Sequence, residues 1–118
     1  VAQVDAYEPL PGVHANGALA RAETLADLSG LAIVHRAYRR SLGAKDPDDR
    51  QFFLGWAHIW RLQSHPEYVR YQLGTSVYAP WAFRANGLVQ HLDAFHEAFG
   101  VTPGDRLFRP PSERVRVW

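Results

Sequence analysis

The feature that most constrains the fold is a long stretch without proline, from about Ala18 to Gly43, in which apolar residues keep the spacing of a helix. These residues are Leu19, Leu25, Leu28, Leu31, Ala32, Val34, Ala37 and Tyr38. Arg36, Arg39 and Arg40 gather toward the end of the stretch, where cations suit the negative pole of a helix dipole. The segment therefore predicts one long helix that Gly43 terminates.

A second helix is expected after a short acidic turn. In Asp46-Pro47-Asp48-Asp49 a capping side chain precedes a proline at the first helical position, and acids occupy the first turn. The residues that follow form a thick apolar face made of Phe52, Phe53, Trp56, Ile59 and Trp60. Arg50 and Arg61 only bracket these aromatics, whereas a platform for stacking nucleic-acid bases needs interleaved basic residues. We therefore interpret this helix as part of the hydrophobic core.

Two shorter helices are expected in the second half of the chain. Ser64-His65-Pro66-Glu67 opens one that stops at Gly74, and another extends from about Leu88 to Phe99, just before Gly100. Residues 75–87 between them are expected to form a loop with one possible helical turn.

The two ends of the chain are predicted to be irregular. Residues 1–17 contain Glu8-Pro9-Leu10-Pro11-Gly12, which excludes a helix there, and a turn signal at Asn16-Gly17. Thr102-Pro103-Gly104-Asp105 predicts a turn, and the tail to Trp118 is expected to be extended. Since no alternating strand pattern stands out, the fold class is mainly α.

Composition excludes several classes of protein. A chain of 118 residues forms one domain at most, and its net charge of +1 with scattered arginines argues against nucleic-acid binding. No apolar run approaches the ~18 residues needed to span a membrane, so no membrane partner is expected. Cysteine is absent, which leaves the compartment open: cytoplasmic, periplasmic or secreted. Methionine is absent even at position 1, so we expect a chain that was processed, trimmed or cut from something longer.

Glu23 and Asp27 are the residues most indicative of chemistry. They stand four residues apart on one face of an otherwise apolar helix, where carboxylates are costly to bury unless something positive pairs with them. One interpretation is that both are solvated or favour the positive end of the helix dipole. The other is a metal ligand with a supporting acid, because a histidine ligand usually donates its second ring N–H to a carboxylate.

The surrounding residues resemble those of a known family. The stretch Asn16–Gly30, NGALARAETLADLSG, is similar to the third-ligand helix of the neprilysin family of zinc metallopeptidases, usually N-G-x-x-T-L-G-E-N-I-A-D-x-G-G. Further segments match in register: Asp5–Gly12 resembles bacterial members, Gln51–Trp60 the family's Q-x-F-F-L-x-x-A-x-x-W, Pro80–Gly87 its S-P-x-x-F-R-x-x-G, and Arg114–Trp118 its C-terminus.

The resemblance implies a fold and a set of roles. The fold would be the C-terminal helical part of a gluzincin-type catalytic domain. Glu23 would be the third protein ligand to zinc, Asp27 would orient a zinc-bound histidine, and Arg84 would grip a backbone carbonyl of a bound peptide. Tyr78 stands where the family has a histidine that stabilises the oxyanion; a tyrosine hydroxyl can donate the same hydrogen bond but supplies no cation. Ala22 and Thr24 also depart from the family wording and leave the ligand itself intact.

The H-E-x-x-H motif, which would provide two zinc ligands and the general base, is missing. The six histidines show no such spacing, and we interpret them as surface or interface residues: His14, His35, His58, His65, His91 and His96. One carboxylate cannot hold a catalytic zinc, so this chain alone should be inactive.

We therefore expect residues 1–118 to be a single incomplete domain, the C-terminal part of a peptidase catalytic domain. A partner chain carrying H-E-x-x-H would share the zinc in an obligate hetero-oligomer that cleaves peptides, and a large apolar surface of this chain would face it. One alternative is a degenerate, non-catalytic homologue that binds a peptide or protein. A plain helical scaffold is a third, which leaves the acid pair unexplained.

Overall fold

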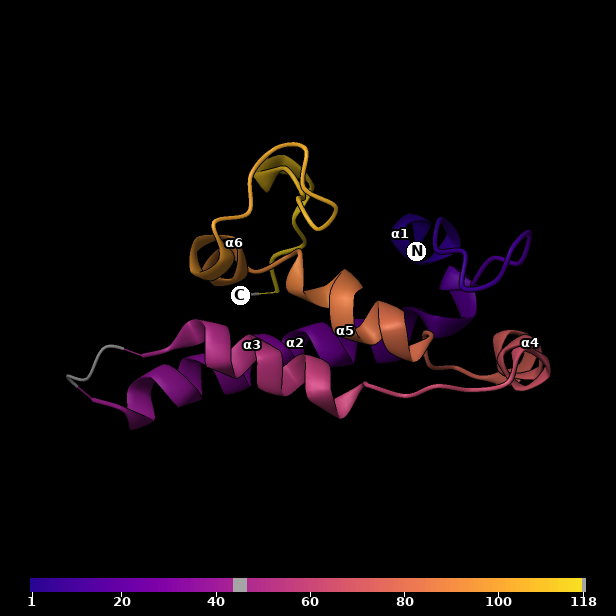
Figure 1. The fold of residues 1–118 in the computed structure, drawn as a ribbon, viewed down its shortest axis with the longest axis horizontal. Helices are drawn as coiled ribbons and strands as arrows, with labels where there is room; N and C mark the ends of the chain where they lie inside the picture. Colours follow the sequence, from indigo (N-terminus) through magenta and orange to yellow (C-terminus); the bar gives the residue numbers. More distant parts are fainter. Residues whose placement is uncertain (44–46, 118) are drawn as a thin grey trace.

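A computed structural model describes residues 1–43 and 47–117, and in these ranges the protein is helical and contains no strands (Figure 1). The mainly α fold class predicted from the sequence is therefore confirmed. Asp46 and Trp118, the expected helix cap and the last residue of the family-like C-terminus, lie outside the described residues. None of the described helices is long and apolar enough to cross a membrane.

Helix α2 (Gly17–Ser41) is the long helix that the apolar spacing predicts. Its N-cap is Asn16, whose side chain accepts a hydrogen bond from the backbone N–H of Leu19 at 2.9 Å. Residues 1–17 are less irregular than expected, because a short helix, α1 (Ala2–Asp5), contacts the start of α2. The Asp5 carboxylate accepts a hydrogen bond from the N–H of Gly17 at 2.7 Å, so α1 satisfies a free donor at the end of α2.

Helix α3 (Asp49–Ile59) begins later than the sequence suggests. Its cap is Asp48, whose carboxylate accepts from the N–H of Gln51 at 3.1 Å, so Pro47 lies before the helix and not at its first position. Asp48 suits the capping position because its short side chain carries a carboxylate that can accept this hydrogen bond and because its ψ of 82° is not helical.

The second half of the chain differs most from the prediction. After α4 (Pro66–Thr75) the expected loop at 75–87 contains most of helix α5 (Trp81–Val89). The expected helix from 88 to 99 is interrupted, and only α6 (Asp93–Phe99) continues it to the left-handed Gly100 (φ 63°). Burial accounts for α5, because most of its residues pack against α2 and α3 and this packing outweighs weak local propensity.

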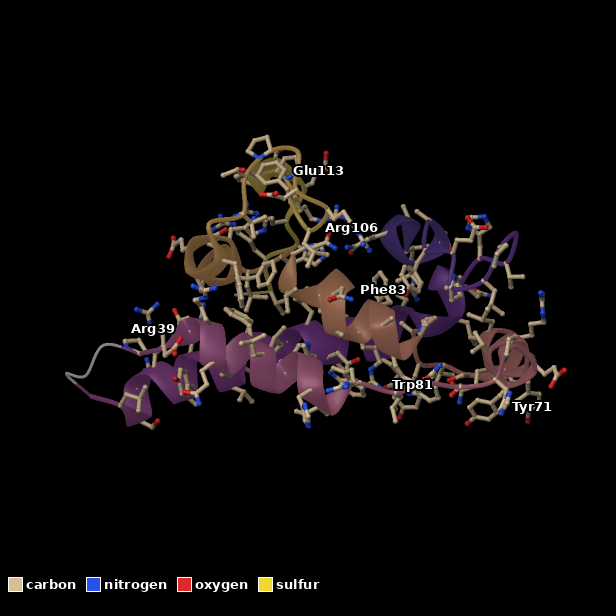
Figure 2. The ribbon with its side chains drawn as sticks, viewed as in Figure 1. Arg39, Tyr71, Trp81, Phe83, Arg106 and Glu113 are labelled. Atoms are coloured by element: carbon tan, nitrogen blue, oxygen red, sulfur yellow. The ribbon has the colours of Figure 1, made fainter. Side chains whose placement is uncertain are left out.

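The core forms where α5 and α6 pack against α2 and α3 (Figure 1). At its centre lies Phe53, whose ring makes edge contacts with those of Phe52 and Phe95 at centroid distances of 5.2 and 5.4 Å. Phe52, Phe53 and Trp56 of the predicted apolar face are thus core, as expected. Ile59 is instead 64% exposed, and Trp60 is not among the described residues that pack in the core. Phe83 of α5 is also buried, whereas Tyr71 of α4 projects at one end of the molecule (Figure 2).

Three histidines are buried, so their interpretation as surface or interface residues is wrong: His35, His91 and His96. Each ring makes at least one hydrogen bond, which offsets part of the cost of burying its polar atoms, although Nδ1 of His96 has no partner among the described residues. His35 pairs with Asp49 at 2.9 Å, and the ring of His96 donates to the carbonyl of Gln90 at 3.0 Å. The other three histidines are exposed, as predicted.

His91 connects three distant parts of the chain. Its Nδ1 accepts a hydrogen bond from the backbone N–H of Val115 at 3.0 Å, so its Nε2 carries the proton and donates to Gln3 at 2.7 Å. Burial, together with the nearby cations of Arg109 and Arg114, lowers the pKa of His91 to about 4. A neutral His91 therefore holds the C-terminal tail against the helices. The tail turns at residues 105–108 and again at Pro111–Glu113, and is otherwise extended.

Candidate metal and substrate-binding site

Helix α2 displays Glu23 and Asp27 one turn apart, and the structure treats the two carboxylates differently. Glu23 is half-buried, and none of the ion pairs in residues 1–43 and 47–117 includes it. The carboxylate oxygens of Glu23 therefore remain available to bind a cation from outside the chain.

Asp27 makes a bidentate ion pair with Arg84 of α5. The Nε of Arg84 donates to Asp27 Oδ2 at 2.7 Å and its Nη2 donates to Oδ1 at 2.8 Å. The side chain of Asp27 is only 17% exposed and that of Arg84 only 13%. Arg84 therefore offsets the free-energy cost of burying Asp27. The sequence predicts a different role for Arg84, that of binding a peptide carbonyl.

Two aromatic rings lie against the Arg84 guanidinium and restrict its movement. Its Cζ atom lies 3.7 Å from the centroid of the Trp60 ring and 5.1 Å from that of Tyr78. The indole N–H of Trp56 donates to the backbone carbonyl of Arg84 at 3.1 Å. Nη1 is left as a donor with no hydrogen-bond partner among the described residues, so Arg84 presents one free edge.

Tyr78 is half-exposed and lies beside Arg84, in the segment between α4 and α5. It lines a cavity of about 250 Å³ together with Tyr7, Leu10, Leu73 and Trp81. The backbone N–H of Tyr78 donates to Ser76 Oγ at 3.1 Å, which fixes the turn that carries it. Three predicted site residues, Asp27, Tyr78 and Arg84, thus meet, and Glu23 is one helical turn from Asp27.

The sequence did not indicate that Trp56 and Trp60 belong to this site. Their spacing of four residues in the sequence matches the apolar face of a core helix equally well. Nothing in local spacing connects them with Arg84, which is 24 residues beyond Trp60 in the sequence.

The described residues do not form a complete metal site. No group of three or more His, Cys, Asp or Glu side chains within residues 1–43 and 47–117 is placed to hold a metal ion. Glu23 fits the role of one zinc ligand, because it is an unpaired, accessible carboxylate, but a zinc site needs further donors. The donor set must be completed from elsewhere if this carboxylate binds zinc.

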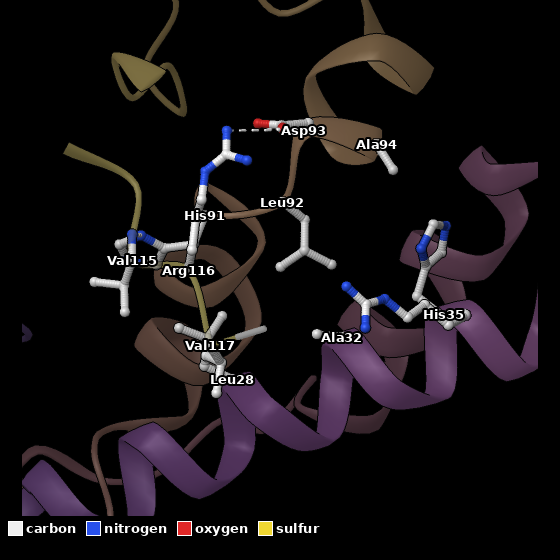
Figure 3. A pocket seen from close by; sticks show the side chains of 11 residues that line it. Leu28, Ala32, His35, His91, Leu92, Asp93, Ala94, Val115, Arg116 and Val117 are labelled. Carbon is white, nitrogen blue, oxygen red and sulfur yellow. Dashed lines mark hydrogen bonds and ion pairs between the residues drawn. The ribbon is translucent and has the colours of Figure 1, made fainter. Parts of the chain in front are cut away.

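A second cavity, of about 260 Å³, lies between α2, the start of α6 and the tail (Figure 3). Its polar lining residues include His35, Arg36, His91 and Arg116, and Arg116 donates to Asp93 at 3.3 Å. None of the four predicted site residues lines it.

A sequence profile for Peptidase family M13 matches residues 1–115. The chain belongs to this family. Among M13 relatives, the neutral endopeptidase of Lactococcus lactis subsp. lactis (strain IL1403) is 35% identical over all 118 residues. Neprilysin-3 of Drosophila melanogaster is 28% identical over 114 residues and aligns with 87% of this chain. The membership of the neprilysin family predicted from the sequence is confirmed.

The fold agrees with that of a solved M13 relative. The zinc metalloprotease Zmp1 of Mycobacterium tuberculosis, in its open state, superimposes on the whole chain with a TM-score of 0.93 and 39% identity. This chain covers 20% of Zmp1 and 18% of the Lactococcus neutral endopeptidase. It therefore corresponds to the helical part of an M13 metallopeptidase domain and spans about a fifth of the length of these relatives.

Proposed function

We propose that this chain supplies one zinc ligand and part of the substrate groove of an M13 metallopeptidase that hydrolyses peptide bonds. The observation that carries the proposal is the contrast between Glu23, which has no cation in the described chain, and Asp27, which is neutralised by Arg84 one turn away. The remaining ligands, two histidines of an H-E-x-x-H helix, would come from polypeptide outside these residues, which we expect to be a partner chain. Residues 1–118 are then one incomplete domain.

Each residue has a stated task in this proposal. Zinc held by Glu23 and two histidines would supply Lewis-acid chemistry, which polarises a carbonyl and lowers the pKa of bound water. Asp27 keeps Arg84 in place and has lone pairs left to accept a histidine N–H from the partner. The free Nη1 of Arg84 donates to a backbone carbonyl of the peptide. The Tyr78 hydroxyl donates to the oxygen on which negative charge develops.

Exposed apolar side chains along α2 support a partner. Large apolar side chains on α2 that face away from the core are half-exposed: Leu25 at 50%, Ile33 at 51% and Val34 at 56%. The protein exposes 7725 Å², whereas a compact monomer of its mass, 13.3 kDa, exposes about 6,500 Å². The excess of about 1,200 Å² is of the order that one side of a stable interface buries.

The test is zinc content in the assembled protein. We expect this chain, co-purified with an M13 segment that carries H-E-x-x-H, to hold one zinc per assembly and to cleave peptides, and Glu23→Gln to lose the metal. Glu97→Gln is the matched control, because Glu97 is an exposed acid on α6 with no ion pair among the described residues. Unchanged zinc content in Glu23→Gln would remove Glu23 from the site.

One observation favours a second candidate function. Tyr78 replaces the histidine that the family pattern has, as in a degenerate homologue that binds a peptide or protein without cleaving it. In that case peptide binding by the chain is independent of zinc and unaffected by Glu23→Gln. The two functions are thus separated by the same variant.

A further inference from the structure

Trp60 occupies an unusual position for a large aromatic residue. Trp56, one turn earlier on α3, packs against the hydrophobic core, whereas Trp60 is not among the residues that pack there in the described chain. The closest ring contact of Trp60 with a charged group is with the Arg84 guanidinium, 3.7 Å from the ring centroid. This distance is at the short end of the range in which a cation is attracted to an aromatic face.

The ion pair with Asp27 leaves one motion of Arg84 unrestrained. Two parallel hydrogen bonds hold the guanidinium edge against the carboxylate, but they resist poorly a tilt of the guanidinium plane about that edge. A tilt would move the Nη1 edge, which has no hydrogen-bond partner among the described residues. The Trp60 ring lies against the guanidinium face and blocks this tilt toward α3.

Helix α3 and its C-cap residue, Trp60, support both ends of Arg84. Trp56 fixes its backbone carbonyl by a hydrogen bond of 3.1 Å, and Trp60 fixes its guanidinium. The two indole rings contact each other edge to face, with centroids 5.5 Å apart. Because α3 also packs on α5 through the core, the distance from the indole pair to Arg84 is fixed by the fold.

We propose that Trp60 is a positioning residue, which holds the Arg84 guanidinium at the angle from which Nη1 meets a backbone carbonyl of the peptide. The proposal rests on the proposed function for the identity of the ligand. The immobilisation of Arg84 does not depend on it and is measurable in this chain. Trp60 acts through Arg84, so it should affect all peptides to the same degree.

The first measurement is hydrogen exchange at the Nε–H of Arg84, followed by NMR in the 118-residue chain. We expect Trp60→Leu to accelerate this exchange by about three- to tenfold, the factor that corresponds to a partly desolvated cation–π contact. Trp60→Phe should restore most of the protection, because a phenyl ring keeps an aromatic face. Leu54→Ala, an exposed apolar truncation on the same helix, should have no effect. Unchanged exchange in Trp60→Leu overturns the proposal.

The second measurement is steady-state kinetics of the zinc-loaded assembly with peptides that differ in the side chains around the cleaved bond. We expect Trp60→Leu to raise KM by about three- to tenfold for every peptide, with kcat and zinc content unchanged, because a ground-state contact is weakened. An unchanged KM, or an effect confined to peptides with particular side chains, overturns the positioning role. If Glu23→Gln keeps its zinc, it is the proposed function that fails, and the exchange result still decides whether Trp60 holds Arg84.

Discussion

The interaction of His91 with the tail makes a quantitative prediction about pH. The neutral ring accepts a hydrogen bond from Val115, and protonation of Nδ1 would place two donors face to face. The pKa of His91 is about 4 in the folded protein and rises to its ordinary value of 6.5 on unfolding. The folded pKa is depressed, so the stabilisation is present above pH 6.5 and is lost as the pH falls toward 4.

The magnitude follows from these two pKa values. Proton linkage gives a loss of about 2 kcal/mol in the free energy of unfolding between pH 7 and pH 5, and about 3 kcal/mol in total below pH 4. A loss of this size is a large fraction of the stability of a small domain. Urea unfolding at a series of pH values between 7 and 4, followed by tryptophan fluorescence, measures it.

Two variants isolate the contribution of His91. His91→Gln keeps a polar side chain but has no titratable group, so the difference between its pH profile and that of the wild type is due to His91. His58→Gln removes an exposed histidine and should leave the profile unchanged. If His91→Gln loses the same stability as the wild type between pH 7 and pH 5, the ring does not titrate with a depressed pKa and the reasoning is refuted.

Three further substitutions test the packing. Gly87→Ala should lower the free energy of unfolding by about 1–3 kcal/mol, because its methyl group would meet the Phe83 ring at 2.7 Å. Asp27→Asn should lower it by about 3 kcal/mol, since the mostly buried Arg84 loses its counter-charge, and both effects are measured by urea unfolding. Ile33→Ser should change the stability of the chain by less than about 0.5 kcal/mol, because the side chain is half-exposed, but weaken assembly with the partner in sedimentation experiments.

Two of these predictions have a control variant, and for the ion pair an opposing outcome is defined. Gly74→Ala is the control for Gly87→Ala: no atom lies within 4 Å of the added methyl group, so the free energy of unfolding should be unchanged or higher. Tyr71→Ser removes an exposed aromatic from α4, on a helix other than α2, and should leave assembly intact. A normal assembly of Ile33→Ser would show that the partner does not cover α2. An unchanged stability of Asp27→Asn would mean that the ion pair contributes nothing.

The sequence predicts the elements that local spacing determines. Helix α2 follows from its apolar periodicity, and the end of α6 follows from Gly100, which takes the left-handed conformation that glycine tolerates. Helix α5 does not follow, because long-range burial against α2 and α3 stabilises it. The buried histidines were missed for the same reason: the partner of His35 is Asp49, across the α2–α3 connection.

The site was predictable residue by residue but not as an arrangement. Family-like motifs single out Glu23, Asp27, Tyr78 and Arg84, but the ion pair of Asp27 with Arg84 joins positions 57 residues apart. Spacing along a chain carries no information about such a contact. The same holds for the contact of Trp60 with Arg84, which joins positions 24 residues apart. The geometry therefore adds how these residues are held, which the motifs leave open.

The different surroundings of Glu23 and Asp27 have a thermodynamic consequence for the proposed assembly. A partner that covers the face of α2 that carries Glu23 would also bury the Glu23 carboxylate, which costs several kcal/mol unless a cation pairs with it. Covering the face and binding zinc are then coupled, and zinc must tighten association of the partner by the same factor by which the partner tightens zinc binding. Glu23→Gln removes the charge, so it should make association with the partner independent of zinc. Equal partner affinity with and without zinc in the wild type would show that Glu23 does not link the two events.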